Sequence, residues 1–142
     1  RIGYLVIPDE VTDSEKLNAA ANVANRILGF VNAPTLQQKV VKACLNEKTD
    51  ISYYDRNRET LYNGLKELGF ECIKPEGAFY LFVKSPVADE KEFCNTAKKH
   101  NILIVPGSSF GCPGYVRMAY CVAYETIVNS LPKFAELAEE YK

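Results

Sequence analysis

Apolar residues recur every three or four positions in the first third of the chain, as expected for one side of a long helix. This apolar stripe consists of Leu17, Ala20, Ala21, Ala24, Ile27, Leu28 and Val31. Thr12 and Glu15 precede it at the spacing of a reciprocal helix cap. Pro34 ends it, because proline disfavours helical dihedral angles in the residue before it. A second stripe follows Thr35, so we expect two helices between Thr12 and about Glu47.

The rest of the chain alternates helical periodicity with short apolar runs bounded by turn residues. Helical spacing is found over 52–68, after Asp89 and over 127–141. Apolar runs predict strands at 2–7, 70–74, 78–83, 102–105 and 115–121. Gly69 is expected to end the helix at 52–68 in a left-handed conformation. The turn at 75–77 is expected to join two of the strands as a hairpin.

The order of these elements indicates the fold class. One strand and three helices are followed by two strands, a helix, two strands and a last helix. Helices grouped beside a mostly antiparallel sheet form an α+β domain. The strand at 2–7 does not obviously belong to that sheet, and we expect it to be the end of another domain. Residues 1–47 would then hold the end of a large domain with linking helices, and 48–142 a small α+β domain.

Composition limits the class of protein. The 142 residues are 47% apolar and 25% charged, which is typical of a globular domain, and the net charge of −1 favours neither nucleic acid nor membrane as a partner. Five irregularly spaced cysteines and one histidine, His100, predict no metal site. His100 is expected to interact with a helix dipole. Because the chain opens on Arg1 without a leader, we expect an internal start and a cytoplasmic protein with reduced thiols.

Three segments carry more specific information. The chain opens Arg1-Ile2-Gly3-Tyr4, and Gly77-Ala78-Phe79-Tyr80-Leu81-Phe82 lies on the strand expected at 78–83. Pro106-Gly107-Ser108-Ser109-Phe110-Gly111 is followed by Gly114-Tyr115-Val116-Arg117. In this order and at plausible spacing, the segments resemble the GxRxGY, GaFYlf and PGxxFGxxGxxxxR segments of class I/II aminotransferases, with a shorter interval between Gly114 and Arg117 than in some relatives. That family has fold type I and depends on pyridoxal phosphate, and the resemblance extends over nearly the whole chain.

The resemblance implies a division of roles. The chain would be the C-terminal part of such an enzyme, with its small domain preceded by a strand and linking helices of the large domain. The lysine that holds the cofactor would lie upstream of Arg1, so this chain alone would carry no catalytic residue. Arg1 would bind the cofactor phosphate and Arg117 the substrate α-carboxylate. Arginine suits both roles, because its planar fork makes two parallel hydrogen bonds to such anions. The substrates would be an amino acid and a 2-oxo acid, and the parent enzyme a homodimer.

Other interpretations remain open. Arg117 lies among apolar residues and could be structural, paired with a carboxylate such as Glu76 or Asp89. Arg1 could be no more than a frayed end. A pyridoxal-phosphate-dependent lyase or decarboxylase of the same fold could share all three segments. So could the non-catalytic, aminotransferase-like ligand-binding half of a transcription regulator.

Overall fold

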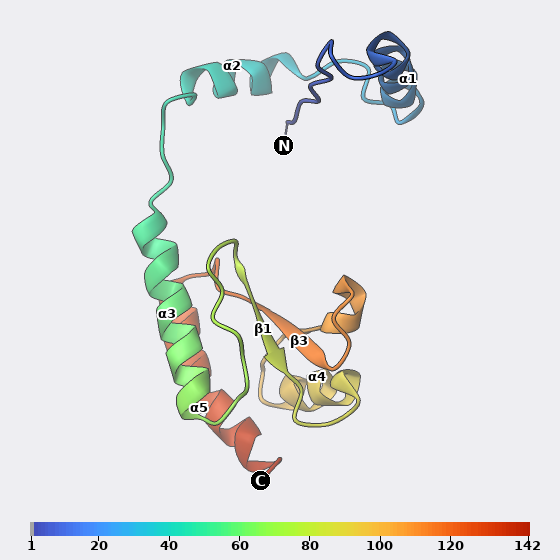
Figure 1. Cartoon of the computed structure of the whole chain (residues 1–142). Helices are drawn as coiled ribbons and strands as arrows, with labels where there is room; N and C mark the ends of the chain where they lie inside the picture. The colour runs from blue at the N-terminus through green and yellow to red at the C-terminus, as the bar shows by residue number, and fades with distance from the viewer. Residues whose placement is uncertain (1) are drawn as a thin grey trace. The chain divides into compact units, whose positions relative to one another are not determined.

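The computed structural model describes residues 2–142, which form two compact units on either side of the Thr49–Asp50 bond (Figure 1). Unit 1 contains α1 (Ser14–Ile27) and α2 (Thr35–Ala43). No residue described in this unit is buried. The apolar stripes of both helices are therefore exposed to solvent. Because such a stripe ordinarily packs against other apolar surface, these stripes indicate that another part of the protein covers them.

Two predictions for unit 1 are wrong in detail. Residues 2–7 form no strand, because a strand requires a hydrogen-bonded partner and none of the strands in the described residues pairs with them. The helix after Thr12 begins at Ser14, with Asp13 at the cap position. Asp13 has a left-handed backbone (φ 59°) and its carboxylate accepts from the Lys16 ammonium instead of from a backbone amide.

Unit 2 holds the sheet and the core. Its elements are α3 (Ile51–Glu67), β1 (Tyr80–Lys84), α4 (Glu90–Lys99), β2 (Val105–Pro106), the short 3₁₀ helix η1 (Gly107–Phe110), β3 (Tyr115–Ala119) and α5 (Tyr124–Glu139). The three strands are antiparallel in the order β1-β3-β2. Helices packed on an antiparallel sheet confirm the α+β fold.

The strands alternate between a buried and an open face. On the buried face, Leu81 lies opposite Met118 and Val83 opposite Val116. The helices cover this face with apolar side chains, namely Leu61 and Leu65 of α3, Phe93 and Ala97 of α4, and Ile127, Phe134 and Leu137 of α5. Helices α3 and α5 pack side by side (Figure 1). The other face carries Phe82 opposite Arg117, both only half-buried.

The helix ends are where local sequence predicted structure best. Gly69 has a left-handed backbone (φ 91°), and the amides of Gly69 and Phe70 donate to the carbonyls of Lys66 and Leu65. This pair of bonds is the Schellman motif, so the predicted end of α3 is confirmed. Asp89 caps α4 as predicted, accepting from the Lys91 amide.

The strands are shorter than predicted. Residues 70–74 contribute a single bridge, Cys72 to Val83, so the hairpin with 78–83 is largely absent. The strand at 102–105 is reduced to β2 at its end, and β3 stops at Ala119 instead of Cys121. Helix α5 continues through Pro132, which neither splits nor ends it.

Candidate functional site

Arg117 lies at the centre of the open face of the sheet, on the middle strand β3. Its cross-strand partners are Phe82 on β1 and Val105 on β2. Its guanidinium carbon lies 3.7 Å from the centroid of the Phe110 ring and 4.1 Å from that of the Tyr80 ring. Both distances are well inside the range of a cation–π interaction. The cation is thus held between two aromatic rings, one from β1 and one from the turn that precedes β3.

No carboxylate pairs with Arg117 among residues 2–142. Neither Glu76 nor Asp89, the two partners that the sequence suggested, forms an ion pair with it, and Asp89 is instead the cap of α4. Since aromatic rings attract a cation without cancelling its charge, the hydrogen-bonding edge of Arg117 keeps its capacity to bind an anion. Within residues 2–142, Arg117 is therefore not one half of an ion pair.

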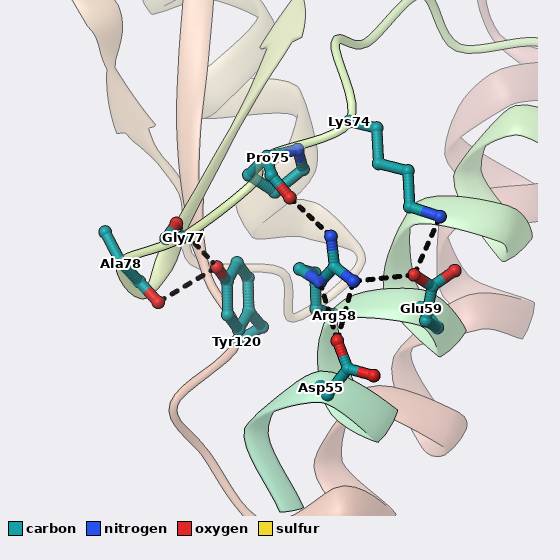
Figure 2. A network of polar contacts seen from close by, with 8 residues as sticks. All are labelled: Asp55, Arg58, Glu59, Lys74, Pro75, Gly77, Ala78 and Tyr120. Atoms are coloured by element: carbon teal, nitrogen blue, oxygen red, sulfur yellow. Dashed lines mark hydrogen bonds and ion pairs between the residues drawn. The ribbon is translucent and has the colours of Figure 1, made fainter. Parts of the chain in front are cut away.

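Arg58 shows what a structural arginine looks like in the same unit. Its guanidinium donates to Asp55 at 2.6 Å, to Glu59 at 2.8 Å and to the Pro75 carbonyl at 2.5 Å (Figure 2). These contacts raise its pKa, chiefly through the hydrogen bonds to Asp55. Four hydrogen bonds from this guanidinium end on oxygens of the chain, so most of its donors are used within the protein.

The Arg58 cluster holds the loop that leads into β1 and so places Tyr80. Lys74 pairs with Glu59 at 2.7 Å, beside the bond from Arg58 to Pro75 (Figure 2). Lys74 and Pro75 lie on the loop before β1, and their partners lie on α3. Phe82 lies opposite Arg117. Tyr80, two residues before Phe82 on β1, therefore shares the face that carries Arg117.

Tyr120 fixes the same loop from the other side. Its hydroxyl lies 3.0 Å from the carbonyls of both Gly77 and Ala78, to which it donates (Figure 2). Ala78 has a left-handed backbone (φ 64°), a conformation that costs a non-glycine residue free energy and persists only where its surroundings impose it. Burial raises the pKa of the Tyr120 phenol, so the hydroxyl keeps the proton that it donates.

The turn at 106–114 places the second ring, that of Phe110. Gly107 is buried in this turn, and a Cβ there would lie 2.6 Å from the Tyr115 carbonyl oxygen and still nearer that of Cys112, so only glycine fits. Glu90, the first residue of α4, is buried and accepts from the Gly114 amide at 3.2 Å. Hydrogen bonds from the Ser108 side chain, and then from backbone amides including that of Gly114, lower the pKa of this carboxyl.

The sequence identified one member of this site and missed the others. Arg117 is where the motif predicts it, whereas Arg1 lies outside the described residues. Tyr80 and Phe110 were within the quoted motifs but had no assigned role. The alternation of β1 and β3 could have placed Tyr80 on the face of Arg117, because residues two apart share a face. No spacing rule links Glu90 to the turn, since they are brought together by tertiary packing.

A cavity in unit 2 lies away from Arg117. It measures about 500 Å³, lies between α5 and residues 100–104, and is lined largely by apolar side chains such as Ile102, Ile104 and Phe134. Arg117 does not line it. No cluster of metal-ligating side chains occurs within the described residues. None of the helices described is long and apolar enough to cross a membrane.

Comparisons with known proteins agree on one family. The family model for class I and II aminotransferases matches residues 1–130. The chain is similar to aromatic-amino-acid aminotransferase 2 of Thermococcus litoralis, with 30% identity over all of this chain and 38% of that protein. It is 32% identical to a probable aspartate aminotransferase of Methanocaldococcus jannaschii, over 98% of this chain and 39% of that protein. Among solved structures, an amino transferase from Eubacterium rectale matches with 47% identity and a TM-score of 0.92, over all of this chain and 36% of that one.

Proposed function

Because the chain belongs to the class I and II aminotransferase family, we propose that it is the C-terminal part of a pyridoxal-phosphate-dependent enzyme that transfers an amino group between an amino acid and a 2-oxo acid. The chain spans less than two fifths of the length of the relatives it matches. The parent enzyme would therefore contain a larger part that supplies the rest of the active site. We expect that parent to be a cytoplasmic homodimer.

The observation that carries this proposal is the unneutralised Arg117 on the open face. An amino acid and a 2-oxo acid share one group, the α-carboxylate, and a carboxylate accepts two parallel hydrogen bonds from a guanidinium. Arg117 lies between two aromatic rings and is half-buried. It has no carboxylate partner among the described residues. In the proposed role it binds and orients the α-carboxylate of both substrates.

Pyridoxal phosphate needs a phosphate site and a lysine for covalent attachment, whereas the described residues offer a site for the substrate carboxylate. When bound, pyridoxal phosphate supplies an electron sink for the bonds that break at the substrate Cα. The family resemblance gives its phosphate to Arg1 and its covalent attachment to a lysine upstream of Arg1. Arg117, placed between two rings on a strand, has the fork that fits a carboxylate. This chain would thus hold the substrate end of the site.

The first test concerns the reaction and uses the full-length parent. L-aspartate and L-phenylalanine serve as amino donors and 2-oxoglutarate as acceptor, and formation of glutamate is measured. We expect glutamate from at least one donor. The 142-residue chain alone should form none, and after incubation with pyridoxal phosphate and desalting it should carry no stoichiometric adduct on any one lysine. Release of CO₂ or ammonia by the parent without glutamate would instead identify a lyase or decarboxylase.

The second test concerns Arg117 in the same parent. Arg117→Lys keeps the charge and loses the two-pronged geometry. Weakening a desolvated, hydrogen-bonded charge pair costs on the order of 2–5 kcal/mol, so kcat/KM should fall by roughly two to three decades. Tm and cofactor occupancy should hardly change.

The matched control is Arg56→Lys. Arg56 also stacks on a ring, 4.0 Å from that of Tyr124, but it lies exposed on α3. Its replacement should leave kcat/KM within about twofold. Near-normal kcat/KM in a folded, cofactor-loaded Arg117→Lys enzyme would exclude the carboxylate role.

A further inference from the structure

We infer that Phe110 and Glu90 are positioning residues for Arg117: Phe110 holds the guanidinium, and Glu90 holds the turn that carries Phe110. The inference rests on the proposed carboxylate role of Arg117. It adds two residues to the site, neither of which has to touch the substrate. It also accounts for the burial of the Glu90 carboxyl group against the turn that carries Phe110.

An arginine side chain needs support if it is to present its fork in one direction. A long, rotamer-rich side chain loses conformational entropy when it is fixed, and this loss weakens binding unless it has occurred beforehand. A neighbouring carboxylate would fix Arg117 but would also occupy its donors. Ring faces fix the guanidinium plane and leave its edge available. With rings at 3.7 Å and 4.1 Å, the cation has little freedom to swing away from the sheet.

The two rings differ in how they are held. Tyr80 belongs to β1, which is paired along its length with β3, so its position follows from the sheet. Phe110 ends the one-turn helix η1 and is exposed. The backbone after it turns at Gly111, which has a left-handed conformation (φ 73°). Phe110 is therefore the ring that needs an anchor outside its own element.

Glu90 provides that anchor. Its carboxylate accepts from the Gly114 amide at 3.2 Å, so it bonds to the turn on the side that follows Phe110 and leads into β3. It is 7% exposed, so water competes little for this bond. Its place in the first turn of α4 favours a negative charge there. Glu90 thus joins a packed helix to the end of this turn at Gly114, whose carbonyl also accepts from the Ser85 amide.

The test uses three variants in the full-length parent. Phe110→Leu removes the ring but keeps an apolar side chain, whereas Phe110→Tyr keeps the ring. Glu90→Gln keeps the shape of Glu90 and removes its charge. The control for Glu90 is Glu92→Gln, because Glu92 is exposed on the same turn of α4.

The first readout is independent of turnover. In parent protein labelled with ¹⁵N at the arginine Nε, the Arg117 signal is identified by its absence in Arg117→Lys. Ring currents from Phe110 and Tyr80 should shift the Arg117 Nε–H signal upfield. The shift should be largely lost in Phe110→Leu and reduced in Glu90→Gln, and kept in Phe110→Tyr and Glu92→Gln. An Arg117 signal unchanged in both Phe110→Leu and Glu90→Gln would overturn the inference.

The second readout separates binding from chemistry. With L-aspartate or L-phenylalanine, KM should rise about tenfold in Phe110→Leu and Glu90→Gln, in line with the loss of a cation–π contact. The value of kcat should stay within about twofold, as expected when binding of ground and transition states weakens equally. Phe110→Tyr should restore KM. If Arg117→Lys impairs turnover and these variants leave KM unchanged, this inference fails alone. If Arg117→Lys is also without effect, the carboxylate role fails with it.

Discussion

At the residue scale, Gly107 is the position of the 106–114 turn with the least room. A Cβ there would lie 2.6 Å from the Tyr115 carbonyl oxygen and still nearer that of Cys112. Both are backbone atoms, which cannot rotate away as a side chain can. Gly107→Ala should therefore destabilise unit 2 by roughly 1–3 kcal/mol, the usual cost of overpacking a buried position. Because β3 follows this turn directly, the geometry around Arg117 should be disturbed as well.

Gly77→Ala is the matched control for that change. Gly77 lies in the other loop of the site, and a methyl group added to it would meet no heavy atom within 4 Å. Its backbone is also not left-handed. Chemical denaturation of both variants measures the free energy of unfolding, and we expect Gly77→Ala to lie within about 0.5 kcal/mol of the wild type. Equal stability of the two variants would show that the turn yields easily at Gly107.

Residue type and motif were enough to locate Arg117 but not its surroundings. The arginine could be singled out because few side chains bind carboxylates in two-pronged fashion. That Glu76 and Asp89 do not pair with it could not be predicted, since ion pairing depends on which side chains tertiary packing brings together. Glu90 follows a helix cap in sequence and has the pattern of an ordinary first-turn carboxylate. Its burial against the 106–114 turn is a tertiary fact.

At the element scale, the accuracy of prediction follows the range of the interactions involved. The end of α3 at Gly69 and the cap of α4 at Asp89 were predicted because each depends on a few neighbouring residues. Strand lengths were overestimated at 70–74 and 102–105, because an apolar run becomes a strand only where a partner continues beside it. The run at 2–7 failed for the same reason. Fold class survived these errors, since the order and type of the other elements were correct.

His100 links two of these elements and predicts a pH dependence of stability. It ends α4, and its ring nitrogens lie 2.5 Å from Glu140 and 3.4 Å from Glu136, the first just after α5 and the second within it. The hydrogen bond to Glu140, followed by contacts with Glu136, raises the pKa of His100 above its ordinary 6.5. The sequence predicted an interaction of His100 with the dipole of α4, and the structure adds contacts with two carboxylates of the C-terminal segment.

The sign of the effect follows from that direction. A histidine with a raised pKa in the folded state stabilises the protein fully below about pH 6.5, and the contribution is lost as pH rises through the folded-state value. Compared with His100→Gln, the wild type should have the higher Tm near pH 6, and the difference should shrink steadily towards about pH 9. Lys133→Gln is the control, since it removes a cation that pairs with Glu136 and leaves His100 in place. A Tm difference that is constant with pH would contradict the ion pairs.

At the scale of the whole molecule, the two units differ in how they bury apolar surface. Unit 2 has a continuous core contributed by all its α-helices and both long strands. Unit 1 has two amphipathic helices and no buried residue among those described. Ile27 is 79% exposed and Leu28 66%. A stripe of this kind on a helix ordinarily packs against a partner, and in the proposed parent the larger part of the enzyme would provide it.

The 142-residue chain by itself should therefore self-associate. Contiguous exposed apolar surface favours association in water, so light scattering after size-exclusion chromatography should show a mass above 15.9 kDa that grows with concentration. Ile27→Lys and Leu28→Lys together should shift the chain towards monomer, whereas Asn25→Lys on the same helix adds charge without removing apolar surface and should not. Reductant is kept in every sample, because Cys44 and Cys121 are exposed and could otherwise link chains covalently. A concentration-independent monomer for the unaltered chain would show that unit 1 satisfies its apolar stripe without a partner, and that the division of the chain into a core-forming unit and a unit completed by other residues is wrong.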